Sequence, residues 1–338
     1  MTIYKELRKR ILILDGGMGT EIMNADLEYD GNNDALPLTD PDFIIGIHKA
    51  YINAGADIIS TCSFGANAVT QKAYGLQDEV RKLNLAAAIA ARCAADNCSD
   101  HKVWVMGSMG PTSKSVTAAE MKKDQSETIT FEALKQDYIT QAIALTDGGV
   151  DGFLVETVTD LRNAEAALQA IREVLSKRGF DLPIMVSATL AGDGGCLVSG
   201  STIQEFVNMA QRYDPLSIGL NCCSGATGIV PYVREISSMT KHAVSVYPSA
   251  GPPTAFGYNE RPSYIAGIMA EMANERLINI AGGCCGTTPE YISEIADALD
   301  GFAPRKYYNK YSPINRIRSF LTRFFPEKPE VTDNNGKL

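Results

Sequence analysis

Short runs of β-branched and other apolar residues alternate along the chain with longer segments whose apolar residues recur at helical spacing. The short runs predict eight strands, at residues 11–14, 56–60, 103–107, 152–156, 183–188, 217–222, 243–247 and 277–281. The longer segments predict helices between them, among others at residues 131–146, 161–178, 202–212, 229–239 and 265–273. Eight alternating strand and helix units favour a (β/α)8 TIM barrel over a doubly wound sheet, which usually has fewer strands.

Two loops of this barrel stand out. A glycine-rich segment, DGGMGT at residues 15–20, follows the first strand but lacks the G-x-G-x-x-G spacing that binds a dinucleotide. A long polar segment at residues 111–130 predicts a loop over the barrel mouth, where loops carry function.

The pattern changes near Pro304, so we expect a barrel domain at residues 1–304 and a carboxyl-terminal extension at residues 305–338. Within the extension, residues 313–325 predict a basic amphipathic helix and residues 326–338 a disordered tail. We expect the helix to pack on the outside of the barrel, with a docking surface for a partner or a membrane as the alternative.

Composition narrows the possible functions. The net charge of −9 disfavours binding to nucleic acid, and no apolar run is long enough to span a membrane or form a signal peptide. We therefore expect a cytoplasmic protein. In that reducing compartment its eight cysteines are more often metal ligands, nucleophiles or small buried residues than disulfides.

Three cysteines are expected to meet at one end of the barrel. Cys222 ends the sixth predicted strand, and Cys284 and Cys285 follow the eighth, in GGCCGTT at residues 282–288. Residues beyond the carboxyl ends of barrel strands face the active-site mouth, and the flanking glycines allow a tight turn. The alternatives are ordinary buried cysteines or a redox pair.

Three thiolates suit a tetrahedral Zn²⁺ whose fourth position is open, as in catalytic zinc sites. Such a centre has a net charge of −1, since the three thiolates outweigh the metal's two positive charges. It is therefore a weak Lewis acid toward water, but it can bind an incoming thiol and lower the pKa of that thiol. The predicted chemistry is attack by sulfur on an activated carbon.

Four motifs together resemble the homocysteine S-methyltransferase family, with a likeness to the homocysteine-binding barrel of cobalamin-dependent methionine synthases. They are DGGMGT at residues 15–20, VET at 155–157, GLNC at 219–222 and GGCCGT at 282–287, and the resemblance spans residues 7–305. It implies a barrel in which Cys222, Cys284 and Cys285 hold zinc and the homocysteine sulfur takes the open position.

The same resemblance suggests the substrate contacts. Glu156, within an otherwise apolar run, suits the α-ammonium of an amino acid, with a salt bridge inside the barrel mouth as the alternative. Asp15 is expected to help hold that ammonium, and the backbone amides of Gly16 and Gly17 to cradle the substrate carboxylate. Apart from the resemblance, Asn221 beside a zinc ligand is expected to hold the substrate or orient the site, with a simple turn former as the alternative, and Ser187 at a strand end is a weaker candidate.

Other cysteines and the histidines complicate this picture. Cys62 stands where methionine synthases typically have asparagine, so it is a candidate competing ligand or an oxidation-sensitive neighbour of the site. Cys223 raises the same question beside Cys222. We keep Cys222 because successive strand residues point in opposite directions. The three histidines, His48, His101 and His242, are expected in packing or surface roles.

The predicted function is zinc-dependent methyl transfer to L-homocysteine, which gives L-methionine. The expected donor is methylcobalamin carried by a separate corrinoid protein or domain, since the chain has no room for a second barrel of comparable size. One alternative is a self-contained enzyme that uses S-methylmethionine or betaine. The other is a non-catalytic zinc- or thiol-binding scaffold whose fourth ligand is Cys62 or Cys223.

Overall fold

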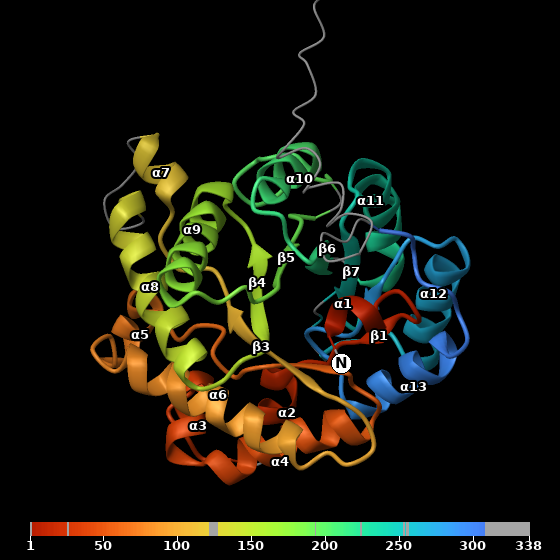
Figure 1. Ribbon diagram of the computed structural model, residues 1–338, viewed down its shortest axis with the longest axis horizontal. Helices are drawn as coiled ribbons and strands as arrows, with labels where there is room; N and C mark the ends of the chain where they lie inside the picture. Colours follow the sequence, from red (N-terminus) through yellow and green to blue (C-terminus); the bar gives the residue numbers. More distant parts are fainter. Residues whose placement is uncertain are drawn as a thin grey trace, which may run out of the picture.

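A computed structural model describes residues 2–307 except 26, 122–127, 193, 224, 253, 255 and 256. The described residues form eight parallel strands that pair in sequence around a barrel, with order β1-β8-β7-β6-β5-β4-β3-β2 (Figure 1). A bridge between Leu14 and Ile58 brings the first strand against the second, so the barrel is nearly closed. The strands are β1 (Leu12–Ile13), β2 (Ile58–Ser60), β3 (Trp104–Met109), β4 (Gly152–Val158), β5 (Ile184–Ala188), β6 (Ser217–Cys222), β7 (Ala243–Pro248) and β8 (Ile280–Ala281). The predicted (β/α)8 TIM barrel is confirmed.

Helices surround the strands on the outside of the barrel. The longer ones are α4 (Pro41–Asn53), α6 (Val80–Asp96), α8 (Phe131–Asp147), α9 (Leu161–Arg178), α10 (Ile203–Gln211), α11 (Ala226–Met239), α12 (Pro262–Asn274) and α13 (Pro289–Leu299). Short helices and turns fill the remaining connections: α1 (Ile3–Glu6), α2 (Met18–Asn24), η1 (Asn33–Ala35), α3 (Leu36–Thr39), α5 (Ala68–Gln71), η2 (Lys72–Tyr74) and α7 (Val116–Glu120). All five helices named from the sequence are present.

Local chemistry explains where these helices begin and end. The Asp160 side chain accepts hydrogen bonds from the first amides of α9, and Gly179 ends that helix in the left-handed conformation. The prediction of a loop at residues 111–130 is wrong for Val116–Glu120, which form α7. Ser115 caps α7 by accepting from the amide of Ala118, and Val116 is buried.

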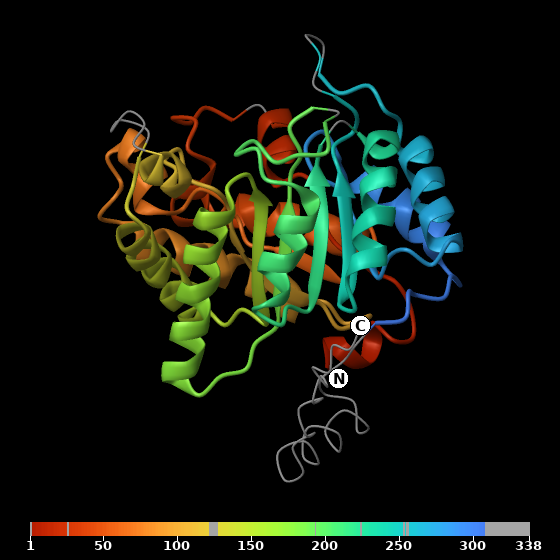
Figure 2. The same ribbon diagram turned by 90° about the horizontal axis from the view of Figure 1, so that it is seen from above.

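Apolar side chains form two cores, one between the strands and the helices and one inside the barrel. The inner core includes Leu12, Trp104 and Met185, and it extends to Leu7 just after α1. Figure 2 shows the barrel from the side, with α1 at the end where the strands begin. The amino end is therefore covered, which leaves the carboxyl ends of the strands for a site.

The last described residues also pack against the barrel. The Arg305 guanidinium donates hydrogen bonds to carbonyls in the last turn of α11 and in the loop to β7, and the Tyr307 hydroxyl donates to the carbonyl of Tyr4. The described chain thus ends beside α1, at the opposite end of the barrel from the strand carboxyl ends. The predicted basic helix at 313–325 and tail at 326–338 lie outside the described residues. None of the described helices has the length and apolarity needed to cross a membrane.

Candidate metal and substrate site

A cavity of about 410 Å³ opens at the carboxyl end of the barrel. Its lining comes from the ends of β1–β4 and β6–β8 and from the loops that follow them. Seven of the nine residues predicted for the site line the cavity: Asp15, Gly16, Gly17, Glu156, Cys222, Cys284 and Cys285. The two remaining predicted residues, Asn221 and Ser187, lie behind the wall, as described below.

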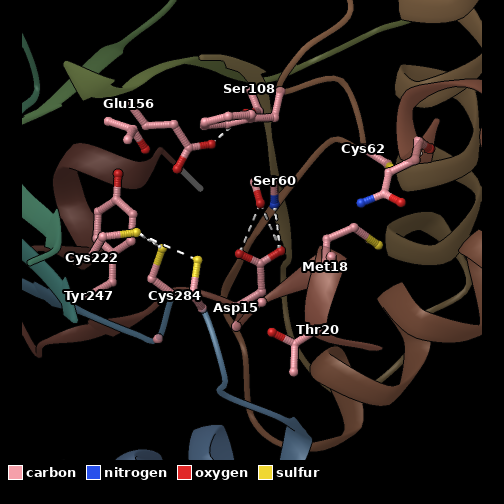
Figure 3. Close-up of a pocket in the computed structure, with 18 of the residues that line it drawn as sticks. Asp15, Met18, Thr20, Ser60, Cys62, Ser108, Glu156, Cys222, Tyr247 and Cys284 are labelled. Carbon is pink, nitrogen blue, oxygen red and sulfur yellow. Dashed lines mark hydrogen bonds between the residues drawn. The ribbon is translucent and has the colours of Figure 1, made fainter. Parts of the chain in front are cut away.

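Three cysteine sulfurs meet at one side of this cavity. The Sγ atom of Cys222, at the end of β6, lies 2.7 Å from that of Cys284 and 3.8 Å from that of Cys285, both in the loop after β8 (Figure 3). All three sulfurs lie within 4.8 Å of one another, and no other group of three potential ligands is this compact among the residues that the structure describes. The predicted convergence of these thiols is therefore present.

The backbone around the cysteines is shaped for this convergence. A Cβ atom added to Gly283 would lie 2.3 Å from Oγ1 of Thr287, so only glycine lets the loop close over that threonine. Gly286 has φ +80°, a left-handed conformation that favours glycine. Cys222 itself has φ 55°, which turns it out of the regular strand.

The three thiols share a negative charge. Hydrogen bonds from Cys222 and Cys284 lower the pKa of Cys285 to about 3. Contacts with Cys222 and Cys285, together with burial, raise the pKa of Cys284 well above its ordinary range. The cluster thus stabilises a thiolate in an arrangement of soft sulfur donors, which is the donor set that Zn²⁺ accepts in proteins.

Glu156 lies in the cavity wall near the sulfurs, on β4. Its Oε1 atom accepts a hydrogen bond from the Ser108 hydroxyl. Burial raises the pKa of Glu156 to about 7, and the negative charge of Cys285 adds to this effect. A cation that enters the cavity would therefore stabilise the ionised form of this carboxyl.

A second carboxyl, Asp15, lies in the wall two residues after the end of β1. It accepts a hydrogen bond of 2.7 Å from the Ser60 amide, and the Ser60 hydroxyl lies 3.1 Å from its Oδ1 atom (Figure 3). Burial raises the pKa of Asp15 well above its ordinary range, and the charge of Glu156 raises it further. No lysine, arginine or histidine is among the described residues that line the cavity. Two carboxyls beside a cysteine cluster therefore lack a protein cation.

A family model for homocysteine S-methyltransferases matches residues 12–299 of this chain. The chain belongs to this family. Membership confirms the resemblance seen in the sequence motifs and identifies the protein as a methyltransferase that acts on homocysteine.

Solved structures agree on the fold. The metallated form of the homocysteine methyltransferase MmuM from Escherichia coli matches with a TM-score of 0.68 and 24% identity, over 86% of this chain and 96% of MmuM. Its oxidized form matches with a TM-score of 0.67 and 24% identity, over 85% and 95% of the two chains. At these identities the likeness shows a shared fold.

Two predicted residues lie behind the cavity wall rather than in it. Asn221 is fully buried, and its Oδ1 atom accepts hydrogen bonds from the Thr157 amide and the Ser187 hydroxyl. Its Nδ2 atom lies 3.6 Å from Sγ of Cys222 and 3.7 Å from Sγ of Cys284. Both side chains thus bond to protein partners in this structure.

Gly16 and Gly17 line the cavity as predicted, but the Gly17 amide already donates a hydrogen bond within the protein. The Gly17 amide is 3.2 Å from both the carbonyl and the hydroxyl oxygen of Thr287. A Cβ atom on Gly17 would lie 2.7 Å from the Cys284 carbonyl oxygen, so glycine allows this loop to approach the cysteine loop. The expected cradle for a substrate carboxylate is therefore limited to the Gly16 amide.

The other cysteines point away from the cluster. Cys62 lines the cavity on the side opposite Cys222, and its thiol donates to the Asn33 carbonyl (Figure 3). The Cys223 sulfur accepts a hydrogen bond from the Leu190 amide. Neither sulfur belongs to the compact group, so a fourth cysteine ligand has no support in this geometry.

Several cavity residues were not predicted. The two carboxyls accept hydrogen bonds from Ser60 and Ser108. The Tyr247 hydroxyl points toward Glu156 and is buried without a hydrogen bond of normal geometry (Figure 3). Ser60 and Tyr247 end predicted strands and Ser108 directly follows one, so their position at the mouth was a usable signal. The three histidines lie outside the cavity lining, as expected.

Proposed function

We propose that this protein transfers a methyl group to the thiol of L-homocysteine to give L-methionine, with Zn²⁺ held by Cys222, Cys284 and Cys285. The observation that carries the proposal is the compact group of three sulfurs beside two carboxyls that have no protein cation. A zinc ion with three thiolate ligands supplies an open position that binds a substrate thiol and keeps its sulfur nucleophilic at neutral pH.

The protein's own residues orient the substrate. The α-ammonium of homocysteine would lie between Glu156 and Asp15, which would replace the missing cation in the wall. Ser108 and Ser60 hold these carboxyls from behind, so each has a fixed direction. The substrate carboxylate would face the Gly16 amide. An amino acid held at its ammonium end presents its thiol to the cysteine group.

The transfer itself is a displacement at carbon. The homocysteine thiol releases its proton to water at the open mouth of the cavity, and a sulfur lone pair then forms a bond to the methyl carbon. The bond between methyl and donor breaks, and its electron pair leaves with the donor. Proximity and orientation supply most of what the protein contributes, because a near-attack arrangement replaces a bimolecular encounter.

We propose methylcobalamin on a corrinoid protein as the donor. Large apolar side chains stay exposed around the mouth, namely Met23, Phe64 and Tyr258, which are 78%, 43% and 39% exposed and also line the cavity. Exposed apolar groups around a cavity are typical of a surface that a partner covers. A docked partner would bring the methyl group over the exposed Cys285 side of the sulfur group.

A small cationic donor is the second candidate. The cavity wall contains carboxyls and no basic side chain among its described residues, which suits a sulfonium such as S-methylmethionine or a quaternary ammonium such as betaine. This donor would enter the cavity itself and needs no partner.

A donor panel separates the two candidates. Zinc-loaded protein is incubated with homocysteine and, in separate reactions, with free methylcobalamin, a methylated corrinoid protein, S-methylmethionine or betaine, and methionine is measured. The proposal predicts slow turnover with free methylcobalamin and faster turnover with the corrinoid protein. Turnover with S-methylmethionine or betaine and none with methylcobalamin favours the small donor. No methionine in any reaction would favour a zinc-binding scaffold.

A further inference from the structure

Strand β4 is irregular at the point where it enters the site. The pairing of β4 with β5 shifts register between Val155 and Val158. Leu154 packs in the inner core, whereas Val155 and Val158 both pack in the outer core. Regular alternation would place residues 155 and 158 on opposite faces, so one residue is inserted between them.

The insertion lies at Glu156 and Thr157, and Thr157 is the residue with the unusual backbone. It has φ 56°, in the left-handed region that β-branched residues rarely adopt. Because of the insertion, Glu156 and Thr157 both line the cavity although they are consecutive in a strand. The irregularity therefore determines which way the Glu156 carboxyl points.

The buried amide of Asn221 holds this conformation by two reciprocal hydrogen bonds. The Thr157 amide donates to Asn221 Oδ1 at 2.9 Å, and Asn221 Nδ2 donates to Thr157 Oγ1 at 2.8 Å. Ser187 on β5 fixes the same Oδ1 atom from a third strand at 2.8 Å. We call this arrangement of Thr157, Asn221 and Ser187 the amide clamp.

The amide clamp joins the two halves of the site. Asn221 directly precedes Cys222, and its Nδ2 atom lies near two of the three sulfurs. Thr157 directly follows Glu156. A single side-chain amide thus connects the sulfur group to the strand that carries the substrate carboxyl.

We propose that Thr157 is a positioning residue, which acts through Glu156 by holding the bulge in β4 in its left-handed conformation. This inference rests on the proposed role of Glu156 as the partner of the homocysteine ammonium. Strained backbone kept by dedicated hydrogen bonds at a cavity wall is typical of functional sites, because a regular strand would be available without strain.

The test compares three variants of the zinc-loaded protein. Thr157→Val keeps the shape but loses the Oγ1 acceptor, Thr157→Ser keeps the acceptor, and Thr157→Gly adopts the left-handed conformation without strain but lacks the hydroxyl. We expect KM and Kd for homocysteine to rise about tenfold in the Val and Gly variants, the effect of one lost hydrogen bond. The Ser variant restores binding, and kcat and zinc content change little in all three.

A double-variant comparison shows whether Thr157 acts through Glu156. In a Glu156→Gln background, Thr157→Val should weaken homocysteine binding by no more than about twofold, because coupled residues are not additive. Equal losses in both backgrounds would overturn the inference, as would wild-type affinity in both the Val and Gly variants. The Gly variant keeps the test open if the Val variant does not fold.

Failure of the proposed function gives a different result. If the wild-type protein binds no homocysteine, a crystal structure of Thr157→Val or Thr157→Gly tests the clamp alone. A Glu156 carboxyl that has left Ser108 supports the positioning role. A carboxyl that stays in place would contradict it.

Discussion

Replacement of Glu156 by glutamine tests whether this carboxyl serves substrate binding or the stability of the fold. Glutamine retains the size of the side chain and an oxygen that can accept from Ser108, but it removes the charge. A carboxyl in a wall without a cation destabilises the free protein when it is ionised, so its removal should make the protein more stable. The same change should weaken substrate binding.

The size of the stability effect follows from the pKa of Glu156, which burial raises from 4.5 to about 7. At 1.36 kcal/mol per pH unit, this difference corresponds to about 3 kcal/mol. Between pH 4.5 and 7 the unfolded chain has released this proton while the folded protein still holds it, so wild-type stability falls as the pH rises through this range. Glu156→Gln lacks this loss, so it should be more stable by up to about 3 kcal/mol at pH 8 and by little at pH 4.

Homocysteine binding should change in the opposite direction. Loss of a charge-assisted hydrogen bond to the ammonium costs roughly 1.5–3 kcal/mol, which raises the Kd roughly 10- to 150-fold. Zinc content should not change, because Glu156 is outside the sulfur group.

The assays are denaturant unfolding at pH 4 and pH 8, titration calorimetry with homocysteine, and zinc analysis. Glu294→Gln is the matched control, since Glu294 is exposed on α13 outside the cavity lining. A variant that loses stability at both pH values would show that Glu156 serves the fold. Unchanged homocysteine affinity would remove Glu156 from the substrate contacts.

Three further predictions follow from the same geometry. Single replacement of Cys222, Cys284 or Cys285 by alanine should remove zinc and activity while circular dichroism stays native, and a variant with stoichiometric zinc would exclude that residue as a ligand. In the wild type, KM for homocysteine should fall as the pH rises through about 7, because Glu156 must be ionised to hold the ammonium, and a flat profile from pH 6 to 8 would contradict this. Arg305→Ala should lower the unfolding free energy by about 2–4 kcal/mol because three partly buried carbonyls lose a charged donor, and a change in KM at intact stability would refute a purely structural role.

The sequence was sufficient for the barrel and for the meeting of the three cysteines. Eight apolar runs of strand length leave few alternative folds, and barrel topology places every strand's carboxyl end at one mouth. Cys222 and Cys284 were therefore expected at the same mouth once their strands were recognised, although 62 positions separate them. The apolar strand pattern and the topology of the barrel were together enough to predict the fold and the meeting of the cysteines.

The detailed roles within the wall depended on contacts that no local pattern contains. The sequence predicts Asn221 and Ser187 as substrate contacts, but in the structure they bond to each other and to Thr157, where the pairing of β4 shifts register. The Gly17 amide is engaged by Thr287, 270 positions away. Such partners are decided by strand register and loop packing, which the periodicity of apolar residues does not specify.

X-ray absorption at the zinc edge tests the central claim most directly, because it counts the sulfur neighbours of the metal. The zinc-loaded protein without substrate should show three sulfurs and one lighter ligand, and addition of homocysteine should give four sulfurs. Serine, which cannot offer a thiol, is the control and should leave three. Four sulfurs before and after homocysteine would indicate a closed structural site and contradict zinc activation of the substrate thiol.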